Sequence, residues 1–93
     1  MSTEMIVARL SIDGNRLVPA LQEAAERLDG AAGEVILDFV SVARIDSSAL
    51  RAIERLASIA DRKAVRVVLC GVNVDVYKVL KLVKLTSRFS FMS

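Results

Sequence analysis

Three small polar side chains stand next to one another in the stretch RIDSSAL: Asp46, Ser47 and Ser48. They follow an apolar run typical of a strand and precede an amphipathic run typical of a helix. One interpretation is helix capping, in which an Asp or Ser side chain accepts a hydrogen bond from the first turn and stabilises the helix by about 1 kcal/mol. Capping explains only one of the three residues, and no Glu or Gln completes a capping box.

The same position also suits a regulatory phosphate. The first turn of a helix carries unpaired N–H groups and the positive end of the helix dipole, which together stabilise an anion. A phosphate on Ser47 or Ser48 would add a charge of about −1.5 to −2, and Arg44 or Arg51 could partly neutralise it. A partner docked over this helix end would have to desolvate that charge, which is costly. Serine phosphorylation would therefore act as a binding switch without unfolding the protein.

A catalytic serine is the weakest interpretation. A nucleophilic serine needs a base and an oxyanion hole, but the chain has no histidine and no G-x-S-x-G elbow. Cys70 is the single cysteine, so a Cys/His metal site is excluded as well. There is no Gly-rich phosphate loop. We therefore expect no catalytic residue, no metal and no cofactor, in a protein that is not an enzyme.

Composition places the chain among small globular proteins. Ninety-three residues correspond to one domain, 1–93, and a hydrophobic fraction of 54% with only 4% aromatic residues predicts an aliphatic core. The net charge of +2 is too small to indicate nucleic-acid binding. Neither a secretory signal nor an apolar run of ~18–20 residues is present. We expect a cytoplasmic monomer or weak homodimer, without direct nucleic-acid binding or membrane insertion.

Alternating strand and helix patterns must position the polar stretch. Period-two and near-continuous apolar runs predict strands, at 5–12, 34–40, 65–71 and 89–93. Apolar residues at three- and four-residue spacing predict three helices, at 15–28, at 47–64 and after a cap at Asn73. This order predicts the α/β class: a single small domain with a four- to five-stranded mixed, largely parallel sheet and about three helices packed on it.

The predicted strand 34–40 leads directly to the polar stretch. Its near-continuous apolar residues are typical of a strand covered on both faces of a sheet. Asp38 interrupts this run and needs a polar partner to be tolerated there. We expect its carboxylate to accept a hydrogen bond from the loop 41–46 and so to hold Ser47 in place.

Two runs, VILDFVSVARIDSSALRAIERL and VRVVLCGVNVDVYKVLKLVKL, resemble the STAS domain, the fold of anti-sigma-factor antagonists. In that family an apolar strand ends in Asp, and after a short linker Asp-Ser-Ser-Gly-Leu opens a helix. The matching residues are Asp38, Asp46, Ser47, Ser48, Leu50 and, after the next strand, Gly71. The resemblance covers roughly residues 5–91 and is strongest from 34 to 85. It implies a small sheet with helices packed on one side.

The resemblance also implies a function. Family antagonists are phosphorylated on the first serine after the motif aspartate, which is Ser47 here, with Ser48 as the second choice. The unphosphorylated form would bind an anti-sigma factor with serine kinase activity and free the sigma factor, and phosphorylation would end that binding. Two alternatives remain open: an accessory subunit of a membrane transport system of the phospholipid ABC transporter type, which the stretch GVNVDVYKVLKLVKL resembles, and a signalling scaffold without a switch.

The expected partner surface centres on the N-terminal half of the predicted helix 47–64, with loop 13–16 beside it. Its expected residues are Asp13, Asp46, Ser47, Ser48, Ala49 and Arg51. Ala49 replaces the glycine of the family motif. Alanine favours a helix more than glycine does, but its methyl group could alter partner choice if it lay on the docking surface.

Overall fold

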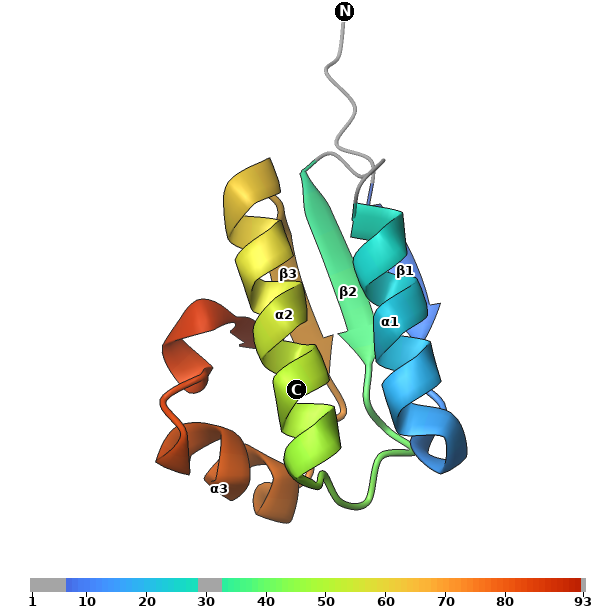
Figure 1. The fold of residues 1–93 in the computed structure, drawn as a ribbon, viewed down its shortest axis with the longest axis vertical. Coiled ribbons are helices and arrows are strands. Elements are labelled where there is room, and N and C mark those ends of the chain that lie inside the picture. Colours follow the sequence, from blue (N-terminus) through green and yellow to red (C-terminus); the bar gives the residue numbers. More distant parts are fainter. Residues whose placement is uncertain (1–6, 29–32, 93) are drawn as a thin grey trace, which may run out of the picture.

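The computed structural model describes residues 7–28 and 33–92 of the chain. Strands and helices alternate in the order β1 (Val7–Ser11), α1 (Leu17–Leu28), β2 (Glu34–Asp38), α2 (Ser47–Lys63), β3 (Arg66–Cys70), α3 (Val74–Leu82) and β4 (Ser90–Met92). Short 3₁₀ turns, Gly14–Arg16 and Thr86–Arg88, precede α1 and β4. The four strands pair in the order β1-β2-β3-β4, and all three pairs are parallel (Figure 1). The prediction of a small α/β fold with a parallel sheet is confirmed; residues 5, 6 and 93 of the predicted strands lie outside the described residues.

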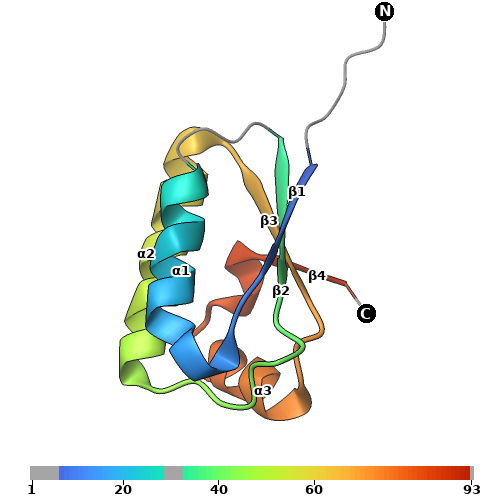
Figure 2. The same cartoon turned by 90° about the vertical axis from the view of Figure 1, so that its right-hand side faces the viewer.

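The helices cover the sheet unequally. Figure 2 shows α1 and α2 side by side over one face, while α3 lies beyond the end at which the strands finish. Residues of β2 alternate between buried and half-buried, so the expectation that this strand is covered on both faces was wrong. Helices α1 and α2 pack on one face of the sheet, as the family resemblance implied.

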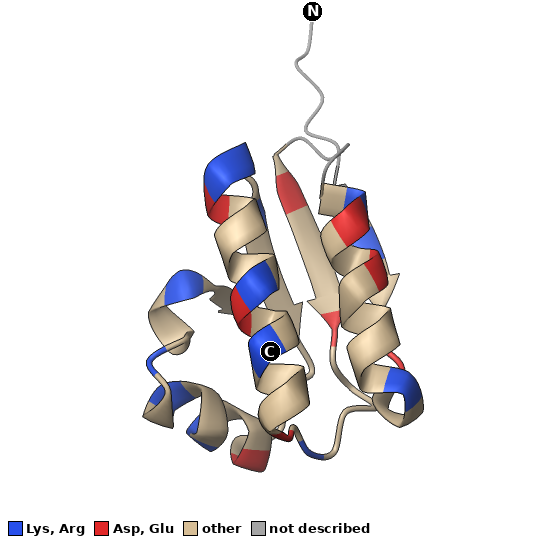
Figure 3. Ribbon diagram, in the orientation of Figure 1, with Lys and Arg blue, Asp and Glu red and all other residues tan. Residues whose placement is uncertain are grey.

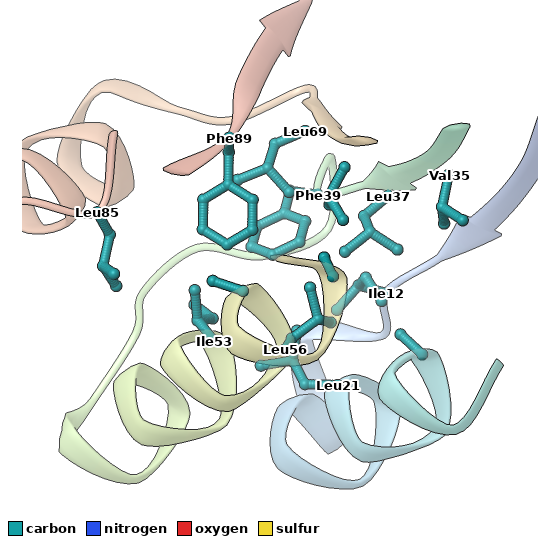
Figure 4. Close-up of a cluster of buried hydrophobic side chains, with 14 of the residues drawn as sticks. Ile12, Leu21, Val35, Leu37, Phe39, Ile53, Leu56, Leu69, Leu85 and Phe89 are labelled. Carbon is teal, nitrogen blue, oxygen red and sulfur yellow. The ribbon is translucent and has the colours of Figure 1, made fainter. Parts of the chain in front are cut away.

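The hydrophobic core lies between the covered face of the sheet and helices α1 and α2 (Figure 4). Its side chains include Val35, Leu37, Phe39 and Leu69 from the sheet side and Leu21, Ile53 and Leu56 from the helices. Most of these side chains are aliphatic, as predicted, with Phe39 the exception among them. Within the described part of the chain, no helix is both long and apolar enough to cross a membrane.

Both covering helices begin at the same end of the molecule. In Figures 1 and 2, the first residues of α1 and α2 lie near the end at which the parallel strands finish. Pro19 falls in the first turn of α1, where its missing N–H costs little. The loops that enter the two helices therefore meet at this edge of the sheet, and the polar stretch belongs to the second of them.

Candidate functional site

Asp46 is the capping residue of α2. Its backbone is extended, with φ −99° and ψ −176°, and its Oδ1 accepts a hydrogen bond of 2.8 Å from the N–H of Ala49. The first main-chain bond of helical spacing runs from the N–H of Leu50 to the carbonyl oxygen of Asp46, at 2.9 Å. Capping is therefore the task of the aspartate alone, and it does not require either serine.

Ser47 and Ser48 occupy the first two positions of α2, and both are exposed. Within residues 7–28 and 33–92, neither hydroxyl group forms a hydrogen bond. Their main-chain N–H groups precede the first helical bond and have no helical acceptor. A group added to either side chain would meet solvent and the positive end of the helix.

The structure places Ala49 in the core. Only 1% of its surface is exposed, so its methyl group packs inward beneath the first turn of α2. Ala49 therefore does not belong to the exposed surface on which a partner could dock. The replacement of the motif glycine by Ala49 therefore changes the packing beneath the first turn of α2 rather than a direct contact with a partner.

Two arginines flank the serines. Arg51 is exposed on α2 and lies one turn beyond Ser47 and Ser48, and Arg44 is exposed in the preceding loop. Neither guanidinium forms an ion pair with a carboxylate of the described residues. Both cations are therefore available to a phosphate or to an acidic partner.

Asp13 lies on the neighbouring loop and caps the turn Gly14–Arg16, where its Oδ1 accepts from the N–H of Asn15 at 2.9 Å. This loop contacts the one before α2 through Ser41. The Ser41 hydroxyl accepts from the N–H of Gly14 at 3.2 Å and donates to the carbonyl oxygen of Ile12 at 2.8 Å. Loop 13–16 thus contacts the loop that leads to α2, and Ser41 joins the two loops.

Asn73 is a positioning residue that the sequence identified only as a cap. Its Oδ1 accepts from the N–H of Val76 at 2.7 Å, which confirms that role. Its Nδ2 also donates to the carbonyl oxygens of Val42 and Ala43, at 3.2 and 3.1 Å. These two bonds hold the loop that leads to Ser47. No local signal could have predicted them, because the donor and the acceptors are about 30 residues apart in the chain.

Asp38 does not hold that loop in the way we expected. Its Oδ1 accepts from the N–H of Val40, at 3.0 Å, and its Oδ2 lies 3.7 Å from the guanidinium of Arg9. The bond therefore falls just before the segment 41–46, and the prediction that Asp38 bonds to that segment was wrong. Ser41 and Asn73 tie the loop down instead.

Replacing Asn73 should separate its two roles. We expect Asn73→Ala to lower the free energy of unfolding by about 2–3 kcal/mol, because it removes the cap of α3 and leaves two loop carbonyls without their donor. Asn73→Asp keeps a capping oxygen but no Nδ2 donor, so it should lose only the loop contribution. Urea unfolding measures both losses. An Asn73→Asp variant as stable as the unmodified protein would contradict the role assigned to Nδ2, and equal losses in the two variants would contradict the capping role of Oδ1.

A groove runs between α1 and α2 and reaches the candidate site. It encloses about 490 Å³, and Ser48 and Arg51 form part of its α2 side. The α1 side includes Val18 and Ala25. Ser47, one residue earlier, does not line it. The two serines are therefore not equivalent: Ser48 faces the groove, and Ser47 lies outside it.

Among the described residues, no three His, Cys, Asp or Glu side chains are placed so that they could hold a metal ion. The residues instead form a capped helix end with two exposed hydroxyl groups, two arginines that pair with no described carboxylate, and an adjoining groove.

Comparisons with known proteins give a family match and structural neighbours. The profile of the STAS domain family matches residues 10–93. The NMR structure of the protein TM1081 superposes with a TM-score of 0.75 and 17% identity, covering 100% of this chain and 90% of that one. A crystal structure of tm1081 from Thermotoga maritima, described as a candidate anti-sigma factor antagonist, has a TM-score of 0.66 and 18% identity, covering 94% of this chain and 73% of that one. At this identity the two structures show a shared fold. A comparison with curated proteins finds no match.

Proposed function

The chain belongs to the STAS domain family, and on this premise we propose that it acts as an anti-sigma-factor antagonist. In this proposal it is a cytoplasmic binding protein, not an enzyme, and its partner is an anti-sigma factor with serine kinase activity. Phosphorylation of Ser47 by that partner ends the binding. The structural neighbour described as a candidate anti-sigma factor antagonist has the same fold, which is consistent with this role.

One observation carries the proposal: Ser47 is exposed and unbonded at the start of a helix that Asp46 already caps. A serine that caps a helix is occupied, and its modification would weaken the helix. Ser47 has no such structural task, so a phosphate can be added and removed while the fold stays the same. This combination of access and structural independence is what a reversible modification site needs.

The physical effect of the phosphate falls on the partner. A charge of about −1.5 to −2 at the first turn is favourable for the isolated protein, because the helix dipole stabilises it. Arg44 and Arg51, which are unpaired and exposed, stabilise it further. A partner that covers this helix end must remove water from the phosphate, and each polar group left without a bond adds to the cost. The bound state is therefore destabilised and the free state is not.

Incubation with the candidate kinase and ATP, followed by mass spectrometry, tests the proposal. We expect one phosphate on Ser47, none on the Ser47→Ala variant, and unchanged modification of Ser48→Ala. A kinase that is active on another substrate but leaves both serines unmodified would contradict the proposed phosphorylation switch. In that case binding of the unmodified protein, without any response to ATP, would favour the signalling scaffold or the transport accessory subunit.

A further inference from the structure

The groove between α1 and α2 has an apolar floor along both helices. Half-buried side chains line it on each side, Val18 and Ala25 from α1 and Ala52 and Ile59 from α2. A second hollow of about 490 Å³ shares Ala25 and Ile59 with the first, so the depression continues toward the C-terminal ends of the two helices. The result is a long apolar trough between two parallel helices, open to solvent.

The charges along this trough are unbalanced. Arg51 and Arg55 line it from α2 one turn apart, and Arg62 lines it two turns further along the helix. Glu26 is the one acidic residue among its lining side chains. None of these arginines forms an ion pair with a described carboxylate. Figure 3 shows basic residues recurring along α2. We call Arg51, Arg55 and Arg62 the arginine row.

We propose that this trough binds an acidic amphipathic helix of a partner protein. The apolar face of such a helix would cover the floor, and its Glu and Asp residues would pair with the arginine row, which is the helix-in-groove mode of recognition. The inference rests on the proposed function in that the helix would belong to the anti-sigma factor. It adds the chemistry of recognition, which the modification site alone does not specify.

A second copy of this chain fits the trough less well. In a symmetric dimer the same patch faces itself across the two-fold axis. The arginine row of one copy would then approach the arginine row of the other, and like charges brought together in an interface are unfavourable. An acidic helix meets the same surface with opposite charge.

The position of the trough also explains how a phosphate at Ser47 could reach its occupant. Arg51 is the first cation of the arginine row and lies four residues after Ser47, a spacing at which side chains on a helix meet. A phosphate on Ser47 would pair with Arg51 and withdraw it from the trough. It would also add negative charge at the end where the acidic helix enters.

The test uses two synthetic amphipathic peptides of about 18 residues, long enough to lie along α2. Both have the same apolar Leu and Ala face, flanked by Glu in one peptide and by Lys in the other. In NMR titrations of the ¹⁵N-labelled protein at low salt, the acidic peptide should shift the signals of Ala25, Ala52 and Ile59. It should bind at least about tenfold more tightly than the lysine peptide and weaken as salt is added. No binding of the acidic peptide, or shifts that map elsewhere, would overturn the proposal.

Charge reversal supplies the matched control. The double variant Arg51→Glu/Arg55→Glu should lose the acidic peptide, whereas Lys78→Glu/Lys81→Glu, which changes exposed lysines of α3 outside the trough, should retain it. Sedimentation analysis of the unmodified protein tests whether a second copy of the chain occupies the trough. A dimer that dissociates in the arginine variant would show that a second copy fills the trough, which contradicts the proposal.

The same peptide separates failure of the trough from failure of the proposed function. If the kinase phosphorylates Ser47 but the acidic peptide does not bind, the proposal that the trough binds an acidic helix is wrong. The proposed phosphorylation of Ser47 is then still supported. If the peptide binds the trough equally well with serine and with phosphoserine at position 47, the trough does bind acidic helices. In that case the proposed effect of the phosphate on the trough is wrong. If the kinase modifies neither serine and the peptide still binds, the proposed phosphorylation switch is wrong and the proposed binding of an acidic helix is supported.

Discussion

Phosphoserine incorporated at position 47 is expected to weaken binding to the proposed anti-sigma-factor partner by at least about 100-fold, or about 2.8 kcal/mol. Ser47 is exposed at the start of α2 in the free protein, so water and the helix dipole stabilise the phosphate there. A docked partner removes that water, and a charge close to −2 that loses its hydration without full pairing costs more than this amount. Isothermal titration calorimetry with the modified and unmodified proteins measures the difference directly.

Three control proteins make this result interpretable. Ser87 is exposed in the turn before β4, and the next residue, Arg88, pairs with Asp61 near the C-terminal end of α2. Phosphoserine at position 87 therefore lies toward the opposite end of α2 from Ser47 and should leave the affinity unchanged. Ser47→Asp, with a smaller charge, should weaken binding less than phosphoserine does, and Ser47→Ala should bind normally. Circular dichroism should show the same helix content in all of them. Full affinity of the phosphoserine-47 protein would mean that the partner does not cover this helix end.

The largest effect on stability is expected for Gly14→Ala. A Cβ atom at this position would overlap with the carbonyl oxygen of Ser41 and lie 2.9 Å from its carbonyl carbon and 3.2 Å from the Cα of Val42. These neighbours are main-chain atoms of a loop that is held in place by Ser41 and Asn73, so they cannot move aside as a flexible side chain would. We expect a loss of about 3 kcal/mol in the free energy of unfolding.

Thermal unfolding measures this loss as a fall in Tm of roughly 12–24 °C for a domain of this size. Asn15→Ala is the matched control, because Asn15 lies in the same turn and its side chain is exposed and unbonded among the described residues. It should change Tm little. If Gly14→Ala were as stable as this control, the two loops could not pack as closely as the structure shows.

The sequence predicted those features that depend on short-range patterns. The parallel alternation of strands and helices follows from apolar spacing and from the single helices between strands. A cap by one of Asp46, Ser47 and Ser48 follows from their place before a helical run, and the structure assigns it to Asp46. The same kind of pattern predicted the cap at Asn73. Each of these features depends on residues close together in the chain, and for this reason the sequence pattern was enough to predict it.

The covering of the sheet could not be predicted in the same way. Val68 and Cys70 of β3 are 6% and 5% exposed, yet they lie outside the core beneath the helices. Arg9, on β1, reaches across the sheet, and its guanidinium lies 3.6 Å from the sulfur of Cys70. The long side chain of Arg9 thus reaches over β2 and contacts Cys70 of β3. An apolar run therefore does not reveal whether a helix or a neighbouring side chain covers it.

The bonds that hold the candidate site connect distant parts of the chain. Ser41 bonds to the carbonyl of Ile12, and Asn73 bonds to the loop at Val42 and Ala43. Which of two adjacent serines faces the α1–α2 groove likewise depends on how two helices pack, not on either helix alone. The motif predicted which residues to consider as a site, whereas the contacts that position them needed the fold.

The strands pair in the order in which a ribosome makes them, β1-β2-β3-β4. Each new strand can add to the edge that the previous one left, so the N-terminal βαβ unit can assemble while the rest is still being synthesised. The loop before Ser47, however, receives the bonds from Asn73 only after that residue has emerged. A nascent chain therefore presents Ser47 on an unfinished loop, and a kinase that recognises the completed surface would act only after Asn73 has emerged and formed these bonds.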